Sequence, residues 1–131
     1  MFIGIDIVEI KRIKGLLDKG KYIEKVFTQN EIALVKDIKE RRRIEILAGR
    51  FTAKEAAVKA LGTGFAEGIL LTDIETIKDE KGKPLMFLYN KAKEKANTMN
   101  IQKFNVSISH CKDYAVAMVV FEGETNNKGG F

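Results

Sequence analysis

Residues 49–64, GRFTAKEAAVKALGTG, decide the fold because they combine the pattern of a buried helix with charged side chains. Small apolar residues recur there at helical spacing and form a stripe that lets a helix lie close to its neighbour. The stripe consists of Ala53, Ala56, Ala57, Ala60 and Leu61. Glycines at 62 and 64 end the pattern, since glycine tolerates the positive φ of a helix terminus. The sequence therefore predicts a central helix.

Glu55 and Lys59 bring charge to this helix. They are four residues apart, which places their Cβ atoms about 6 Å apart on one face. Two interpretations are open at this point. The residues form an exposed ion pair worth only a few tenths of a kcal/mol, or they belong to a functional site. The backbone N–H groups of residues 62–64 favour the second, because they offer a place for an anion.

The composition indicates one globular domain. With 131 residues, 45% of them hydrophobic, the chain can bury one core. We expect a domain over residues 1–121 and a disordered tail over 122–131, which has linker composition. One cysteine excludes an internal disulfide framework, and one cysteine with one histidine excludes a structural zinc site.

The same numbers bound the location and the partners. No apolar run reaches the length of a membrane span and no basic leader precedes the first acids, so we expect a cytoplasmic protein without a membrane anchor. The net charge of +5 suggests an acidic partner, nucleic acid or a phosphate-bearing ligand, and it is too small to choose among them.

Asp6 is an anomaly in the first predicted strand, residues 2–8, which is otherwise apolar and β-branched. A carboxylate in such a run costs several kcal/mol unless it is paired, hydrogen-bonded or bound to a metal. The alternative is that Asp6 caps a helix beginning near Glu9.

Further helices flank the central one. Thr28 and Glu31 have the spacing of a capping box, and Asn90 is a candidate cap for a later helix. We expect helices over residues 12–25 with a break at Gly20, from 28 to about 36, from 41 into the central stretch, and over 91–99. The first is the most basic part of the chain.

The remaining apolar segments predict strands. Phe104, Val106 and Ile108 alternate with polar residues, which is typical of a strand with one face in the core. A turn over residues 79–84 separates two short apolar runs and indicates a hairpin. The expected strands are 74–77, 85–88, 104–109 and 114–121.

Three polar features lie at the ends of apolar elements. They are Asp6, the pair Glu55 and Lys59, and the strand end Ser107-Ser109-His110. Together they would form a pocket suited to a magnesium ion that holds a diphosphate, because magnesium takes few protein carboxylates and leaves its other positions to water and phosphate. Judged by itself, His110 is more typical of a structural histidine.

These residues stand in motifs that resemble a known family. The motifs are GIDIVEIKRI (4–13), FTAKEAAVKALGTG (51–64), GKP (82–84), VSISH (106–110) and YAVAMVV (114–120). In this order they resemble the holo-acyl-carrier-protein synthases, the short bacterial type of 4′-phosphopantetheinyl transferase. The resemblance covers residues 3 to about 121.

The resemblance implies a reaction and a site. The family moves 4′-phosphopantetheine from coenzyme A to a serine of apo acyl carrier protein, for fatty acid biosynthesis, and releases 3′,5′-adenosine bisphosphate. By this likeness Asp6 and Glu55 would bind magnesium, and Lys59 would neutralise charge as the phosphoanhydride breaks. We favour Glu55, directly or through a metal-bound water, as the base for the serine hydroxyl.

The resemblance also implies binding surfaces and an assembly. Arg12 and the basic helix after it would dock the acidic carrier protein. The fold would be α+β, with a small antiparallel sheet on a long helix, and the protein a homotrimer with active sites at the subunit interfaces. Family positions near coenzyme A are occupied by Arg50, Gly62, Thr63, Lys83, Pro84, Ser109 and His110.

Two rival functions fit parts of the same sequence. A nucleic-acid-binding module fits the charge, but the aromatic residues are mostly single Phe side chains at core positions rather than a stacking row. A carrier-binding scaffold without catalysis is the second rival. The presence of Asp6, Glu55 and Lys59 argues against it.

Overall fold

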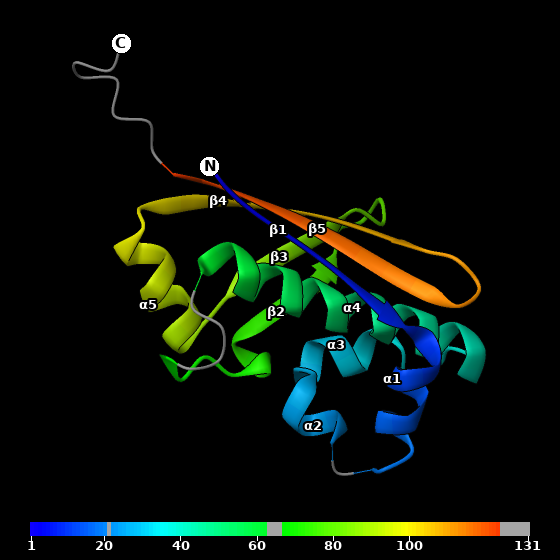
Figure 1. Cartoon of the computed structure of the whole chain (residues 1–131). Helices are drawn as coiled ribbons and strands as arrows, with labels where there is room; N and C mark the ends of the chain where they lie inside the picture. Colours follow the sequence, from blue (N-terminus) through cyan, green and yellow to red (C-terminus); the bar gives the residue numbers. More distant parts are fainter. Residues whose placement is uncertain (21, 63–66, 124–131) are drawn as a thin grey trace, which may run out of the picture.

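The structure, a computed structural model, describes residues 1–20, 22–62 and 67–123. Its longest element is α4, a helix of 22 residues (Figure 1). It begins at Glu40, one residue before the predicted start, and ends at Leu61. The order of elements is β1 (Phe2–Glu9), α1 (Ile10–Leu17), α2 (Ile23–Val26), α3 (Gln29–Leu34), α4 (Glu40–Leu61), η2 (Leu71–Asp73), β2 (Ile74–Lys78), β3 (Pro84–Leu88), α5 (Asn90–Thr98), β4 (Ile101–His110) and β5 (Tyr114–Gly123).

An antiparallel sheet of three strands, in the order β1-β5-β4, lies across α4. Helices α1, α2 and α3 gather near the N-terminal half of α4, and α5 lies at its other end (Figure 1). Strands β2 and β3 form the predicted hairpin as a separate two-stranded sheet. This confirms the expected α+β fold, with an antiparallel sheet packed on a long helix.

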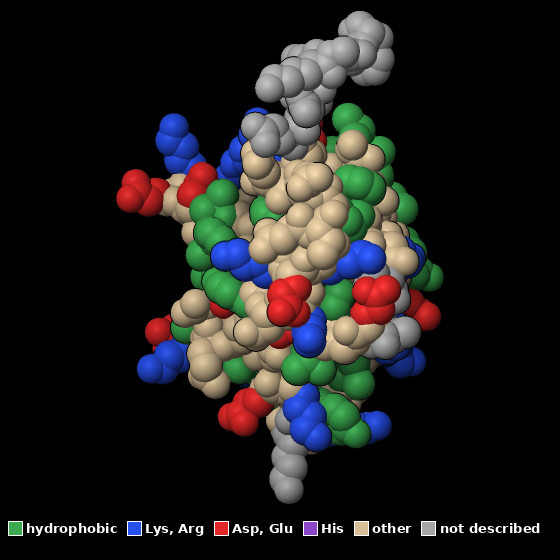
Figure 2. All heavy atoms as spheres, turned by 90° about the vertical axis from the view of Figure 1, so that its left-hand side faces the viewer, with side chains coloured by type: hydrophobic (Ala, Val, Ile, Leu, Met, Phe, Trp, Pro, Cys, Tyr) green, Lys and Arg blue, Asp and Glu red, His purple; other side chains and the backbone are tan. Residues whose placement is uncertain are grey.

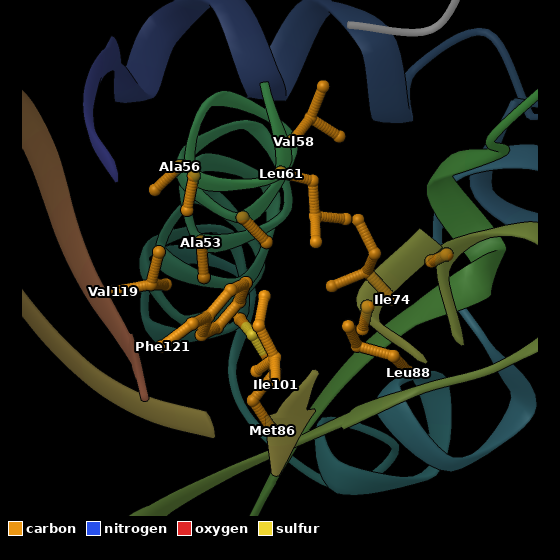
Figure 3. Packing of buried hydrophobic residues seen from close by; sticks show 14 of the residues in the cluster. Ala53, Ala56, Val58, Leu61, Ile74, Met86, Leu88, Ile101, Val119 and Phe121 are labelled. Atoms are coloured by element: carbon orange, nitrogen blue, oxygen red, sulfur yellow. The ribbon is translucent and has the colours of Figure 1, made fainter. Parts of the chain in front are cut away.

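The small-residue stripe of α4 packs into the core as predicted. Ala53 and Ala56 face Val119 and Phe121 of β5, while Leu61 lies toward the β2–β3 hairpin (Figure 3). All of these side chains are buried. Full burial of a side chain such as Phe121 contributes about 1.5–3 kcal/mol, so these contacts help to attach the sheet to the helix.

Strand β1 touches α4 backbone to backbone. A Cβ atom added to Gly4 would lie 1.9 Å from the carbonyl oxygen of Ala56, so only glycine fits at this position. A Cβ on Gly49 would lie 2.8 Å from the Cγ2 of Ile108 in β4. The two glycines set the approach of the sheet to α4, and Gly4 places Asp6, two residues along β1, beside that helix.

The alternative that Asp6 caps a helix is excluded, and the prediction that Asn90 is a cap is wrong. Helix α1 has Glu9 as its N-cap, without a side-chain hydrogen bond, and Asp6 lies inside β1 instead. Helix α5 begins at Asn90, with Tyr89 as its N-cap. The Asn90 amide donates to Asp73 Oδ1 at 3.0 Å, because the fold brings the end of η2 close to the start of α5.

Other boundaries agree with the sequence more closely. The capping box of Thr28 and Glu31 is present, and the chain breaks after α1 around Gly20, whose φ is +61°. Strand β5 extends two residues further than predicted, because Glu122 and Gly123 still pair with β4. The rest of the predicted tail, 124–131, lies outside the described residues.

On the face that carries α5, basic and acidic side chains are interspersed (Figure 2). This face therefore does not offer the continuous basic surface that nucleic acid requires. Within the described ranges, none of the helices combines the length and the apolar character needed to cross a lipid bilayer.

Candidate active site

Asp6 projects from β1 toward α4 and is held there by two side chains of that helix. The Thr52 hydroxyl donates to Asp6 Oδ2 at 2.7 Å, and Lys59 Nζ donates to Oδ1 at 3.0 Å. Lys59 also donates to the carbonyl oxygen of Ile5 at 3.1 Å. The anomalous carboxylate is thus satisfied by hydrogen bonds, and 18% of its side chain remains exposed.

The predicted ion pair between Glu55 and Lys59 is not formed, because Lys59 pairs with Asp6 instead. Among the residues that the structure describes, no side chain donates a hydrogen bond to the Glu55 carboxylate or forms an ion pair with it. Partial burial raises the pKa of Glu55, and the negative charge of Asp6 raises it further, while Arg12 and Lys59 oppose the shift. The two carboxylates are therefore close enough to repel each other.

Arg12 stands at the edge of this group. Its guanidinium carbon lies 5.8 Å from the centre of the Phe51 ring, a cation–π contact between α1 and α4. Phe51 is buried, whereas Arg12 is exposed. A fixed, exposed cation beside the carboxylates is suited to guide an acidic partner.

A second group of predicted residues lies apart from the first and lines a pocket of about 230 Å³. Arg50, Pro84 and His110 contribute to it, and its remaining walls are Arg42, Glu45, Ile46, Gly49, Gly82 and Ile108. Arg50 Nε donates to the carbonyl oxygen of Thr76 at 3.3 Å. Burial lowers the pKa of Arg50, Glu31 opposes the shift, and Arg42 adds to it.

His110 has charged neighbours in this pocket. Its Nε2 lies 3.4 Å from Arg42 Nη1 and 3.8 Å from Glu45 Oε2. Arg42 and Glu45 are themselves 3.7 Å apart. The residues 42 and 45 were not singled out from the sequence, where the run of three arginines gives no sign of which one faces the histidine.

The other predicted residues lie at the margins. Lys83 is exposed in the β2–β3 turn, where its N–H donates to Asp79 Oδ1 at 2.9 Å. Ser109 is exposed and, by the alternation along β4, projects from the face opposite to that of His110. Gly62 ends α4 with a φ of +75°, as predicted, and Thr63 lies outside the described residues.

The two groups face different directions on one chain. Arg50 and Glu55 are five residues apart on α4, which corresponds to a rotation of about 140° around the helix. Asp6, Lys59 and Glu55 lie on one side of α4, and the pocket with Arg50 and His110 lies on another. The sequence predicted one pocket for these residues, whereas the structure of one chain separates them into two groups.

Sequence reasoning missed a buried ion pair beside the site. Lys54 Nζ lies 2.6 Å from Glu31 Oε1, both side chains are fully buried, and Lys54 also donates to the carbonyl oxygens of Leu71 and Ile74. Glu31 Oε2 accepts the N–H of Thr76 at 2.9 Å. Glu31 was identified only through its capping box, because no local pattern signals a partner 23 positions away.

The network continues to a second buried carboxylate. Glu75 accepts hydrogen bonds from the Thr28 hydroxyl at 2.5 Å and from the Tyr89 hydroxyl at 3.0 Å. Burial raises the pKa of Tyr89, and its bond to Glu75 adds to the shift. The network connects α3, α4 and β2 on the side of α4 that faces away from Asp6.

Comparison with known proteins places nearly the whole chain in one family. Residues 2–119 match the family described as the 4′-phosphopantetheinyl transferase superfamily. A relative from Clostridium tetani, a holo-[acyl-carrier-protein] synthase, is 49% identical over 93% of this chain and 95% of its own length. A synthase of the same name from Maridesulfovibrio salexigens is 45% identical over 92% of this chain and 96% of its own.

Solved structures agree with this match. A holo-(acyl-carrier-protein) synthase from Bacillus anthracis, in complex with CoA (3′,5′-ADP), aligns with a TM-score of 0.79 and 41% identity over 94% of this chain and 96% of that one. The Helicobacter pylori holo-[acyl-carrier-protein] synthase in complex with coenzyme A gives 0.78 and 39% over 92% and 99%. The fold and the coenzyme seen in these complexes are those that the motifs led us to expect.

Proposed function

Because the chain belongs to the 4′-phosphopantetheinyl transferase superfamily, among its holo-[acyl-carrier-protein] synthases, we propose that Asp6, Glu55 and Lys59 carry out its reaction. The enzyme transfers 4′-phosphopantetheine from coenzyme A to apo acyl carrier protein, a step of fatty acid biosynthesis. The observation that carries the proposal is the meeting of two carboxylates and one lysine between β1 and α4.

The residues have separate tasks in the transfer. The carrier serine oxygen bonds to the phosphorus that bears the pantetheine arm, and the phosphoanhydride bond breaks, with its electron pair leaving on 3′,5′-adenosine bisphosphate. Glu55 takes the serine proton, directly or through a metal-bound water. Lys59 offsets the negative charge that develops on the phosphate oxygens.

The carboxylates fit a magnesium ion. Asp6 and Glu55 repel each other in the protein alone, and a divalent cation would relieve that repulsion. Magnesium typically binds one or two protein carboxylates plus substrate phosphates, and Asp6 and Glu55 supply such a pair. When bound, magnesium would neutralise diphosphate charge.

The division of the site into two groups supports a homotrimer with active sites at the subunit interfaces. Asp6, Glu55 and Lys59 would come from one subunit, and Arg50, Pro84 and His110 from its neighbour. Coenzyme A would then span the interface, with Gly62, Thr63, Lys83 and Ser109 at its margins. This arrangement explains why one chain keeps the groups on different sides of α4.

The outer face of the three-stranded sheet supplies a surface for such an assembly. Ile3, Ile5 and Ile7 of β1 are 58%, 58% and 62% exposed, beside Tyr114 and Met118 of β5 at 45% and 44%. Ile5 lies opposite Met118 in the ladder, and Ile3 and Ile7 lie opposite Val120 and Val116, so these side chains form one apolar patch. Patches of this kind on a folded chain mark association surfaces.

The carrier protein would dock beside Arg12. The exposed side chains of α1 include Lys11, Arg12 and Lys14, so this helix presents positive charge next to Glu55. We place the enzyme in the cytoplasm, in keeping with its free, exposed Cys111 and the reducing conditions there.

The residue roles can be tested by intact mass of an apo acyl carrier protein after incubation with the enzyme, coenzyme A and magnesium. We expect a gain of one phosphopantetheine with the parent, none with a chelator, and a rate at least about a hundredfold lower with Asp6→Ala or Glu55→Gln. Near-parental turnover of Glu55→Gln would contradict both of its roles. Carrier binding without any transfer by the parent would favour the scaffold alternative instead.

The interface can be tested by mixing defective subunits. A Glu55→Gln chain and an Arg50→Ala, His110→Ala chain are each inactive in one half of the site, but every mixed trimer would contain one intact site of three. Random mixing makes three quarters of the trimers mixed, so we expect about a quarter of parental activity to return. A mixture of Asp6→Ala with Glu55→Gln, both in the same half, is the control and should recover none. Absence of recovery in the first mixture, with subunit exchange verified, would exclude shared sites.

A further inference from the structure

Thr52 is a polar residue within the small apolar stripe of α4. Threonine forms helices less readily than alanine, which occupies the next position and several others along the stripe. The Thr52 side chain is fully buried. A hydroxyl in such a place is unfavourable unless it is hydrogen-bonded, so the choice of threonine here calls for a reason outside the helix.

The reason is its contact with Asp6. The Thr52 hydroxyl donates to Oδ2 at 2.7 Å while Lys59 holds Oδ1 at 3.0 Å, and both donors come from α4, two turns apart. With one donor on each oxygen, the carboxylate cannot rotate freely about its Cβ–Cγ bond. An ionised carboxylate has about four acceptor sites, so each oxygen keeps one for a cation.

A second buried threonine shows that this contact is not a general necessity. Thr76 in β2 is also fully buried, and its Oγ1 has no hydrogen-bond partner within the described part of the chain. The fold therefore tolerates a buried threonine hydroxyl that has no hydrogen-bond partner among the described residues. Thr52, by contrast, directs its hydroxyl to one of the two carboxylates of the site.

We propose that Thr52 is a positioning residue for Asp6: its hydroxyl holds the carboxylate in the orientation that binds magnesium. The inference rests on the role of Asp6 in the proposed function. Because Thr52 is buried, it acts through Asp6 without touching substrate or metal. Groups that orient a metal ligand in this way commonly change metal affinity about 10–100-fold when they are removed.

The test compares Thr52→Val, which keeps the shape and removes the donor, with Thr52→Ser, which keeps the donor. One readout is the magnesium concentration for half-maximal transfer. The other is magnesium affinity measured by isothermal titration calorimetry with coenzyme A and no carrier protein. We expect Thr52→Val to weaken both about tenfold, Thr52→Ser to stay near the parent, and the KM for carrier protein to be unchanged.

Matched variants make the result decisive. Thr76→Val removes a buried hydroxyl of equal size and should leave magnesium affinity at the parental value. If Thr52→Val behaves like Thr76→Val while Asp6→Ala abolishes magnesium binding, the role of Thr52 is wrong and that of Asp6 stands. If Asp6→Ala also keeps parental affinity, the metal role of Asp6 fails and the inference falls with it. Thr52→Ala, a helix-favouring replacement, repeats the test if valine disturbs folding.

Discussion

Helix α4 carries two lysine–carboxylate pairs that differ in their access to water. Lys54 and Glu31 are 2.6 Å apart and both fully buried, whereas Lys59 and Asp6 are 3.0 Å apart with 56% and 18% of their side chains exposed. The buried pair uses its remaining hydrogen-bonding capacity on backbone groups of the protein. The exposed pair lies beside Glu55, which has no such bond among the described residues. Similar chemical groups thus fix the helix on one side and are available to a ligand on the other.

The difference lies in the cost of desolvation. Two charges taken out of water lose their hydration, and only good geometry and further hydrogen bonds offset that cost. A buried pair therefore adds little net stability but is costly to break. Burial lowers the pKa of Lys54, and the nearby Glu31 opposes that shift. The Lys54 network therefore holds α4 in one rotation, and that rotation directs Glu55 and Lys59 toward β1.

The largest expected effect follows from breaking the buried pair. Lys54→Met leaves Glu31 buried without its cation and should lower the free energy of unfolding by about 3–5 kcal/mol. Urea denaturation followed by circular dichroism measures this. Adding Glu31→Gln, which removes the stranded charge but keeps an amide for hydrogen bonding, should recover most of the loss. A decrease of less than about 1 kcal/mol in the single variant would mean that the pair is not buried as described.

The exposed pair should show the opposite balance of stability and activity. Lys59→Met should change the free energy of unfolding by less than about 1 kcal/mol, because surface pairs contribute little. The same change should lower kcat/KM about 10²–10³-fold, since a charge that stabilises the transition state is lost. Carrier modification rates by mass spectrometry, beside the same urea titration, measure both. Equal losses of stability in Lys59→Met and Lys54→Met would remove the distinction between the two pairs.

A smaller effect is expected at the entrance to the exposed site. Arg12→Ala should raise the KM for carrier protein about three- to tenfold with little change in kcat, because an exposed cation mainly favours association. Steady-state kinetics at several salt concentrations measure this, and the variant should respond less to salt than the parent. Lys93→Ala, at an exposed basic residue on α5, is the matched control and should behave like the parent.

The smallest effect concerns the stability of the metal-free protein as a function of pH. The pKa of Glu55 is raised in the folded state above its ordinary 4.5, so folding favours the protonated carboxyl. That contribution to stability is complete below the unfolded pKa and is lost as pH rises through the folded value. At pH 7 the ionised Glu55 should therefore cost stability, and Glu55→Gln should stabilise the metal-free protein by less than about 1 kcal/mol.

The check is a pair of urea titrations with a chelator, at pH 7 and at pH 4. The advantage of Glu55→Gln over the parent should shrink at pH 4, where Glu55 is largely protonated in both states. An advantage that grows as the pH falls would reverse the sign of the shift and contradict the crowding of the two carboxylates.

Local pattern predicted most of the fold. The stripe of Ala53 and its neighbours, the capping box at Thr28 and the alternation around Val106 each depend on a few adjacent residues, and each appears in the structure. Asn90 failed as a cap because its partner, Asp73, lies 17 positions away. The Lys54–Glu31 pair was not predicted for the same reason, since only the folded chain brings the two residues together.

The candidate site was predictable as a set of residues but not as an arrangement. Asp6 stood out because a carboxylate in an apolar strand requires a partner, and the motifs named Glu55 and Lys59. That Lys59 pairs with Asp6 rather than Glu55, and that Thr52 completes the contact, depends on how β1 crosses α4. The separation of Arg50 and His110 from the carboxylates likewise follows from the rotation of α4.

The contact between Gly4 and the carbonyl oxygen of Ala56 sets a dimension of the candidate site. Gly4 is two residues from Asp6, and Ala56 is next to Glu55. The distance between the backbones that carry the two carboxylates is therefore set by main-chain atoms on both sides. Main-chain atoms in a strand and a helix have no rotamers to exchange. The approach of the two backbones that carry Asp6 and Glu55 is therefore as rigid as the secondary structure itself. A single methyl group at position 4 would widen it.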